Sequence, residues 1–147
     1  MEKAIIDCAL ALRKNSLISI KFVQTKRAEP RLNLKRFIHI KVGNSSSDLS
    51  HLFYQAYNSA QLFPSDPSFK EHVRQLLPTN KQSIISPEDN NSEYEIVIAI
   101  VDKSDRSVYD SIPFFSKISL NNISQRIRSM GYRLSLLKIG VEIVDKL

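Results

Sequence analysis

Hydrophobic and polar residues alternate in two stretches of this 147-residue chain, and this spacing predicts β-strands. The stretches are residues 17–24 and 35–42, where neighbouring side chains would point to opposite faces of a sheet. A strand is also predicted over residues 93–101. Its unbroken apolar run from Ile96 to Val101 is typical of a central strand with both faces covered. Residues 132–144 are predicted to close the sheet as a strand.

Apolar residues recur at helical spacing in four other stretches. Pro64 is expected to stop the second of these helices, because proline has no N–H to continue the hydrogen bonding. Ser119 is expected to begin the fourth by accepting a hydrogen bond from a free N–H. The polar segment 79–92 is predicted to be a mobile loop. The four helical stretches are residues 2–14, 49–63, 66–77 and 119–130. The other residues with capping chemistry are Ser47, Asp48, Asp66, Pro67 and Gly131.

Together these elements predict one α+β domain over residues 1–147. Its order is helix, strand, strand, helix, helix, strand, helix, strand. The strands would form a mixed sheet of about four strands with helices packed on it. Because a helix joins the last two strands, these are predicted to be parallel neighbours.

Positive charge is concentrated at the start of the chain. The net charge is +6, and residues 1–41 hold ten basic against three acidic side chains. Such a block favours binding to polyanions through the release of counterions. A solvated charged hairpin, or a surface for an acidic protein partner, would have the same composition. The cations predicted to contact nucleic acid are Lys21, Lys26, Arg27, Arg31, Lys35, Arg36 and Lys41.

The turn after the second strand is a candidate anion site. It holds the first glycine of the chain, Gly43, and then a run of serines before the predicted helix. Serine hydroxyls, backbone N–H groups and a helix N-terminus all favour a phosphate. An ordinary capped turn would have the same residues. The side chains predicted to take part are Ser45, Ser46, Ser47 and His51.

Composition excludes several other classes of protein. Cys8 is the single cysteine, so the chain has neither a disulfide framework nor a cysteine-based zinc site. Its apolar runs are far shorter than the ~20 residues that span a bilayer. Glu2 and Asp7 do not fit a secretory signal peptide. A cytoplasmic protein without membrane contact is therefore expected.

Several blocks of the sequence resemble a family of large, uncharacterised bacterial proteins of sporadic distribution. The resemblance covers about residues 35–139 and rests on the order and spacing of the blocks RFIHIK, LSHLFYQAYNSAQLF, YEIVIAIVDK and PFFSKISLNNISQRIRSMGY. Family members are several times longer, so the chain resembles their C-terminal portion. The sporadic distribution implies a mobile-element or phage-defence setting.

The order of elements around His39-Ile40-Lys41 is similar to that of restriction-endonuclease-like domains. In those domains a Glu-x-Lys strand and an upstream acid hold a divalent metal that activates water. Here His39 replaces the glutamate, and only Glu29 could serve as the acid. The catalytic candidates are therefore Lys41, His39 and Glu29, with Mg²⁺ or Mn²⁺ as cofactor only under this alternative. Otherwise His39 would hydrogen-bond within the sheet, and Lys41 would be a surface or phosphate-contacting lysine.

Two aromatic clusters permit two interpretations each. Phe114 and Phe115 beside Lys117 could stack on nucleic-acid bases, but they are expected above all to fill a packing position before a helix. Tyr54, Gln55 and Tyr57 carry polar tips on an apolar helix. They resemble the Gln and Tyr that some nuclease families place on the equivalent helix, but the two tyrosines could also be ordinary boundary residues.

The sequence therefore favours a nucleic-acid-binding domain that uses its basic N-terminal surface, for DNA or RNA. A metal-dependent nuclease, active or inactive, is the second hypothesis. The third is a protein-interaction module of a larger or split assembly, with a protein partner or a second copy of the chain.

Overall fold

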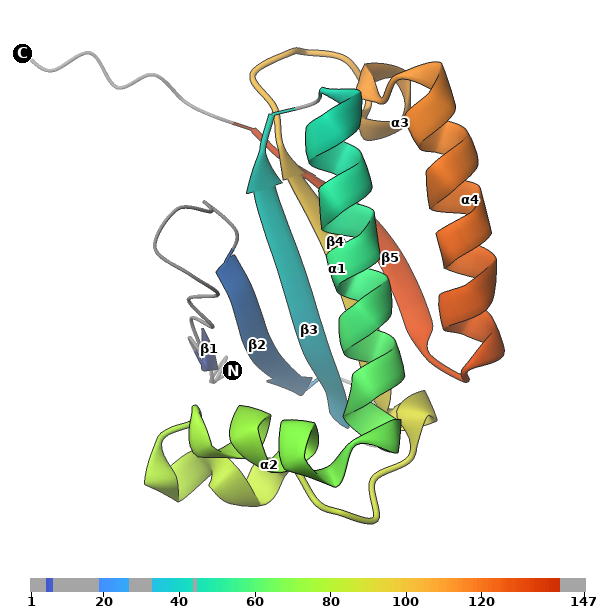
Figure 1. The fold of residues 1–147 in the computed structure, drawn as a ribbon. Coiled ribbons are helices and arrows are strands. Elements are labelled where there is room, and N and C mark those ends of the chain that lie inside the picture. The colour runs from blue at the N-terminus through green and yellow to red at the C-terminus, as the bar shows by residue number, and fades with distance from the viewer. Residues whose placement is uncertain (1–4, 7–18, 27–32, 44, 141–147) are drawn as a thin grey trace, which may run out of the picture.

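The computed structural model describes residues 5–6, 19–26, 33–43 and 45–140. Its sheet has five strands in the order β1-β2-β3-β4-β5. Strands β1, β2 and β3 are antiparallel neighbours, whereas β3, β4 and β5 run parallel (Figure 1). The bounds are Ile5–Ile6 for β1, Ser19–Lys26 for β2, Asn33–Val42 for β3, Tyr94–Val101 for β4 and Arg133–Ile139 for β5. The α+β class and the parallel last pair are confirmed, but the sheet has five strands rather than about four.

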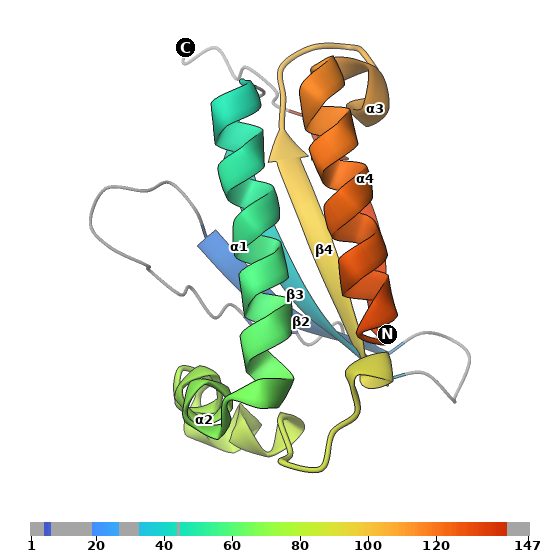
Figure 2. The same ribbon diagram turned by 45° about the vertical axis from the view of Figure 1, so that its right-hand side comes forward.

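Two long helices lie side by side on one face of the sheet, and both begin at the end where the parallel strands finish (Figures 1 and 2). The segment predicted to be a mobile loop contains two short 3-10 turns, and its mobility stays a prediction. The short helix α3 was not predicted. The bounds are Ser46–Ser65 for α1, Pro67–Gln75 for α2, Thr79–Ile84 for η1, Asn91–Glu93 for η2, Val108–Ser111 for α3 and Phe114–Ser129 for α4.

The helix predicted over residues 2–14 is not present at Ile5 and Ile6, which form β1. These two residues pair with Val23 and Phe22 of β2. β-Branched isoleucine suits an extended strand better than a helix, so a neighbouring strand decides the conformation. The rest of that predicted helix lies outside the described residues.

Helix α1 runs past Pro64 to Ser65, although Pro64 was expected to stop it. Proline has no N–H, so the carbonyl of Ala60, four residues earlier, loses its partner in the helix. The buried hydroxyl of Tyr132 donates a hydrogen bond of 2.9 Å to that carbonyl. A residue from the far end of the chain therefore satisfies the group that proline leaves open.

Helix α4 begins at Phe114, five residues before the predicted cap Ser119. The Ser119 hydroxyl instead donates 3.2 Å back to the carbonyl of Phe115, the alternative partner of a serine inside a helix. Phe114 and Phe115 were expected above all to fill a packing position, and this is wrong. Their side chains are 71% and 76% exposed on the first turn of α4.

The predicted caps of the other helices are partly confirmed. Asp66 accepts hydrogen bonds from the N–H groups of Ser68 and Phe69 at the start of α2, with Pro67 in the first position. Gly131 ends α4 with a φ of +92°, where a glycine is favoured. The cap of α1 is Ser45 rather than Ser47 or Asp48.

The core fills the space between the helices and the sheet. From β3 it receives Phe37, whose ring centroid lies 4.8 Å from that of Phe63 and 5.3 Å from that of Tyr94. The run from Ile96 to Ile100 of β4 is buried, as predicted. This layer fixes α1 and α4 against the parallel strands and holds their outer surfaces in place.

Candidate functional site

The carboxyl ends of the parallel strands bring β3, β4 and the start of α1 together. Gly43 follows β3 and donates a hydrogen bond of 3.1 Å to the carbonyl of Val101, the last residue of β4. Its φ of +102° requires glycine. Loops at this end of a parallel sheet commonly form binding sites.

Lys41 and Asp48 form an ion pair at this end, with 3.0 Å between the Nζ and Oδ1 atoms. The Ser45 hydroxyl donates to Asp48 at 2.6 Å and accepts from its N–H at 3.2 Å. The hydrogen bond from Ser45, followed by Lys41, lowers the pKa of the Asp48 carboxyl. The predicted anion site therefore already contains an anion of its own. Ser46, Ser47 and His51 are exposed beside it.

A second charged cluster follows β4 at the same end of the sheet. Asp102 accepts from the hydroxyl and N–H of Ser104, and these bonds lower the pKa of its carboxyl. Lys138 of β5 lies 3.8 Å from Asp102 and donates to the carbonyls of Ser104 and Arg106. These contacts hold the Lys138 side chain against the loop that follows β4.

His39 points into the core and is fully buried. Neither of its ring nitrogens has a hydrogen-bond partner among the described residues. Burial lowers the pKa of the imidazole from 6.5 to about 4, so the ring is neutral at pH 7. Two roles were predicted for His39. A hydrogen bond within the sheet is not seen among the described residues. To be bound by His39, a metal ion would have to enter the closed core.

Two further predicted phosphate contacts are also paired within the protein. Lys35 is 8% exposed and contacts Asp89 at 2.5 Å and Glu93 at 3.4 Å. Arg36 contacts Glu95 at 2.5 Å. Lys21 and Lys26 lie in β2, whose side chains are not described, and Arg27, Glu29 and Arg31 lie outside the described residues. The structure therefore places Lys41 beside Asp48 and separates it from Lys35 and Arg36, which lie towards the other end of β3.

A shallow hollow of about 130 Å³ between α1 and α4 was not predicted as a site. We call it the helical groove. The Arg126 guanidinium lies 5.8 Å from the ring centroid of Tyr57. The feature of the sequence that could have indicated a site here is that α4 carries basic residues but no acidic residue. The groove is lined by Tyr54 and Tyr57 of α1 and by Ser119, Asn122, Ile123 and Arg126 of α4.

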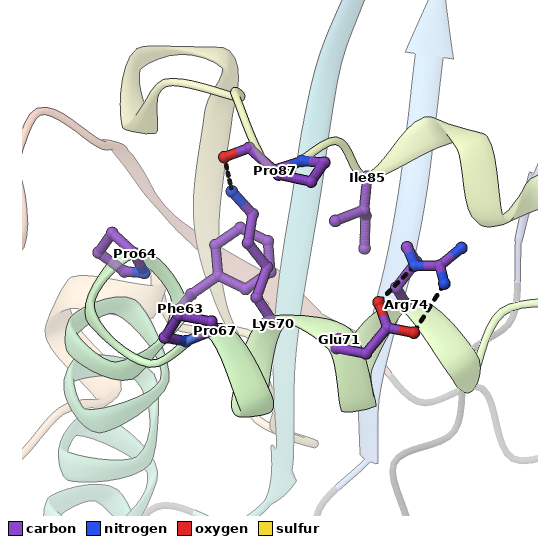
Figure 3. Close-up of a pocket in the computed structure, with 8 residues that line it drawn as sticks. All are labelled: Phe63, Pro64, Pro67, Lys70, Glu71, Arg74, Ile85 and Pro87. Carbon is purple, nitrogen blue, oxygen red and sulfur yellow. Dashed lines mark hydrogen bonds and ion pairs between the residues drawn. The ribbon is translucent and has the colours of Figure 1, made fainter.

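A larger hollow, of about 340 Å³, lies where α1 passes into α2 (Figure 3). Phe63, Ile85 and three prolines give it apolar walls. Lys70 donates to the carbonyl of Pro87 at 3.1 Å, and Arg74 donates to both carboxylate oxygens of Glu71. Because these cations are already paired, we assign no ligand to this hollow.

Among known protein families, the chain matches a family of unknown function (DUF6119) over residues 31–140. The chain belongs to this family. The DUF6119 match spans β3 to β5, including both long helices and the carboxyl end of the parallel strands. No curated protein and no solved structure matches the chain. In the part of the chain that the structure describes, no helix is both long and apolar enough to cross a membrane.

Proposed function

We propose that the chain is a nucleic-acid-binding domain. The observation that carries the proposal is the concentration of positive charge before β3. Residues 1–34 hold seven basic side chains against three acidic ones. Polyanion binding by such a segment needs charge rather than a pocket, because the binding energy comes from released counterions.

Ion pairs within the protein limit which cations are available to contact a nucleic acid. Lys35, Arg36 and Lys41 each face a carboxylate of the same chain, so they contribute less to a phosphate than their number suggests. Of the ten basic side chains of residues 1–41, seven remain for binding, namely Lys3, Arg13, Lys14, Lys21, Lys26, Arg27 and Arg31.

Fluorescence anisotropy with labelled DNA and RNA at several salt concentrations tests the proposal. We expect the logarithm of the affinity to fall steeply as the logarithm of salt rises. Replacing both Arg27 and Arg31 by Gln should reduce that slope by about 2, one for each lost contact. Lys81→Gln with Lys103→Gln, a matched pair elsewhere in the chain, should leave the slope unchanged. If neither nucleic acid binds at low salt, the proposal is wrong.

A metal-dependent nuclease is the second candidate. The observation in its favour is that one carboxylate, Asp48, lies 3.0 Å from Lys41. The described residues do not otherwise fit a metal: no three His, Cys, Asp or Glu side chains gather among them, and His39 is closed off in the core. Incubation with Mg²⁺ or Mn²⁺ and single- or double-stranded substrates tests this candidate. Cleavage that Lys41→Met abolishes would support it, and uncut substrates would reject it.

The mobile-element or phage-defence setting and the protein-interaction module stay predictions. Light scattering of the purified chain separates a monomer from an assembly and tests the second of these.

A further inference from the structure

We propose that the helical groove binds the bases of a single-stranded nucleic acid. This inference rests on the proposed function and names its substrate class. Its starting point is the exposure of aromatic side chains on α1 and α4. Tyr54 is 58% exposed and Phe115 is 76% exposed, although aromatic residues of this size contribute most when they are buried.

Phe115 lies in line with the polar residues of α4 that line the groove. Phe115, Ser119, Asn122 and Arg126 follow one another at spacings of four, three and four residues, so they share one flank of α4. Residues Ser119, Asn122 and Arg126 face Tyr54 and Tyr57 of α1 across the groove. At 1.5 Å per residue, the row from Phe115 to Arg126 is about 16 Å long.

The charge of this surface suits a nucleic acid. Arg126 is the cation on this flank, and α4 contains no acidic residue. By the same helical spacing, Arg128 and Lys117, whose Nζ lies 4.4 Å from the ring centroid of Tyr109, are on the opposite side of α4. The single acid of α1, Asp48, is paired with Lys41. Asn122 can hydrogen-bond to base edges, and Arg126 can contact a phosphate while it stays over Tyr57. The groove is smaller than the roughly 300 Å³ at which drug-sized ligand pockets begin. A flat ring that stacks on an exposed aromatic side chain needs no deeper site.

Single strands fit this surface better than duplexes. Bases in a duplex are stacked on one another, so their faces do not reach aromatic side chains, whereas those of a single strand do. At the stacked spacing of 3.4 Å, a row of about 16 Å matches roughly five nucleotides. A protein that docks on the exposed phenylalanines would not need Arg126 or Asn122.

The test compares a labelled 15-nucleotide single strand with a duplex of the same length, at low salt and with the full chain. We expect the single strand to bind more tightly. Tyr54→Ala and Phe115→Ala should each weaken its binding about 5- to 150-fold, the range for one lost base stack. Duplex affinity should change by less than about twofold, because the phosphate contacts remain.

Leu137→Ala is the control. Leu137 is 48% exposed on β5, and it lies one residue after Leu136 and three after Leu134, which pack against the core from the other face of the strand. It should leave both affinities unchanged. Circular dichroism checks that each variant is folded. If the chain binds both nucleic acids and the two groove variants bind them like the unchanged protein, the groove inference is wrong and the proposed function stands. If the unchanged protein binds neither, the proposed function fails and the inference fails with it.

Discussion

His39 shows how a single residue can combine a functional sequence pattern with a buried environment. In the sequence it stands in a His-x-Lys arrangement at the end of a strand, which resembles the metal-binding strand of nuclease-like domains. In the structure the same alternation that exposes one side of β3 turns His39 inwards, between the sheet and the helices. The residue is therefore placed to affect stability rather than to contact a substrate.

We expect the stability of the protein to depend on His39 between pH 6.5 and about 4. The folded state holds the imidazole neutral, and the unfolded state takes up a proton below pH 6.5. With respect to His39, the unfolding free energy is therefore highest above pH 6.5, and it falls as the pH drops from 6.5 to about 4. A pKa change of this size corresponds to about 3 kcal/mol of unfolding free energy.

Urea unfolding of His39→Leu at several pH values measures the effect. Because no hydrogen bond is lost, the variant should match or exceed the stability of the unchanged protein at pH 7, and its stability should fall less between pH 6.5 and 4.5. His72→Leu, at an exposed position on α2, is the control and should keep the original pH dependence. Equal pH curves for the unchanged protein and His39→Leu would contradict this account.

Asp48 is the second residue with a distinct prediction. Asp48→Asn removes the carboxylate that pairs with Lys41 but keeps the N–H that Ser45 caps. If Lys41 is then free for a phosphate, polyanion binding should tighten and its salt slope should steepen by about 1.

A matched control exists at the start of α3. Asp110 has the same bonds to Ser107 that Asp48 has to Ser45, but no lysine partner is seen among the described residues. Asp110→Asn should therefore leave the salt slope unchanged. The same slope change in both variants would show that net charge, rather than the release of Lys41, is responsible.

At the level of elements, the bond from Tyr132 to the Ala60 carbonyl explains why α1 continues through Pro64. We expect Tyr132→Phe to lower the unfolding free energy by about 1–3 kcal/mol, because a buried carbonyl is left without a partner. Pro64→Ala supplies an N–H that can bond to the same carbonyl. When Pro64→Ala is already present, Tyr132→Phe should therefore lower the unfolding free energy by a smaller amount. Chemical unfolding of the four proteins gives this coupling, and additive effects would contradict it.

The sequence predicts most elements of the sheet and helices well, and the failures have long-range causes. Strands β3 and β4 and helix α2 follow from local periodicity and capping, which neighbouring residues determine. The end of α1 depends on Tyr132, 72 residues from Ala60. The start of α4 depends on which partner the Ser119 hydroxyl takes, and a serine pattern allows either.

In the candidate site too, contacts between residues close in the sequence could be predicted, and contacts between distant residues could not. Lys41 and Asp48 are close in the sequence, and a polar turn that could bind an anion was predicted there. The partners of Lys35 and Arg36 lie 54 and 59 residues away, so the sequence showed these cations as free. The helical groove joins Tyr57 to Arg126 from two separate helices, and no local pattern brings them together.

At the scale of the whole molecule, three cations of residues 1–41 connect different elements: Lys35, Arg36 and Lys41 each pair with a carboxylate of a later segment. Lys35 links β3 to the segment before β4 through Asp89 and Glu93. Burial raises the pKa of Asp89, but hydrogen bonds from Lys35, Tyr94 and the N–H of Ser86 outweigh it and leave the pKa below its usual value. The ten basic side chains of residues 1–41 thus overstate the charge that a ligand would meet there, because Lys35, Arg36 and Lys41 pair with carboxylates of later segments.

Lys35→Met should therefore lower the unfolding free energy by about 3 kcal/mol, because it leaves a largely buried carboxylate without its cation. It should not change the salt slope of nucleic-acid binding at temperatures where the variant is folded. Lys103→Met, at an exposed position, is the control for stability and should have little effect. A reduced slope in folded Lys35→Met would mean that Lys35 contacts the ligand after all.

The bond between Tyr132 and the Ala60 carbonyl also has an evolutionary consequence. Proline at position 64 and a hydroxyl at position 132 compensate for each other, so substitutions at the two positions should be correlated among members of the family. Chains that keep the proline should keep tyrosine at the position of Tyr132. Chains in which another residue replaces Pro64 recover the N–H, and phenylalanine should then become acceptable at position 132.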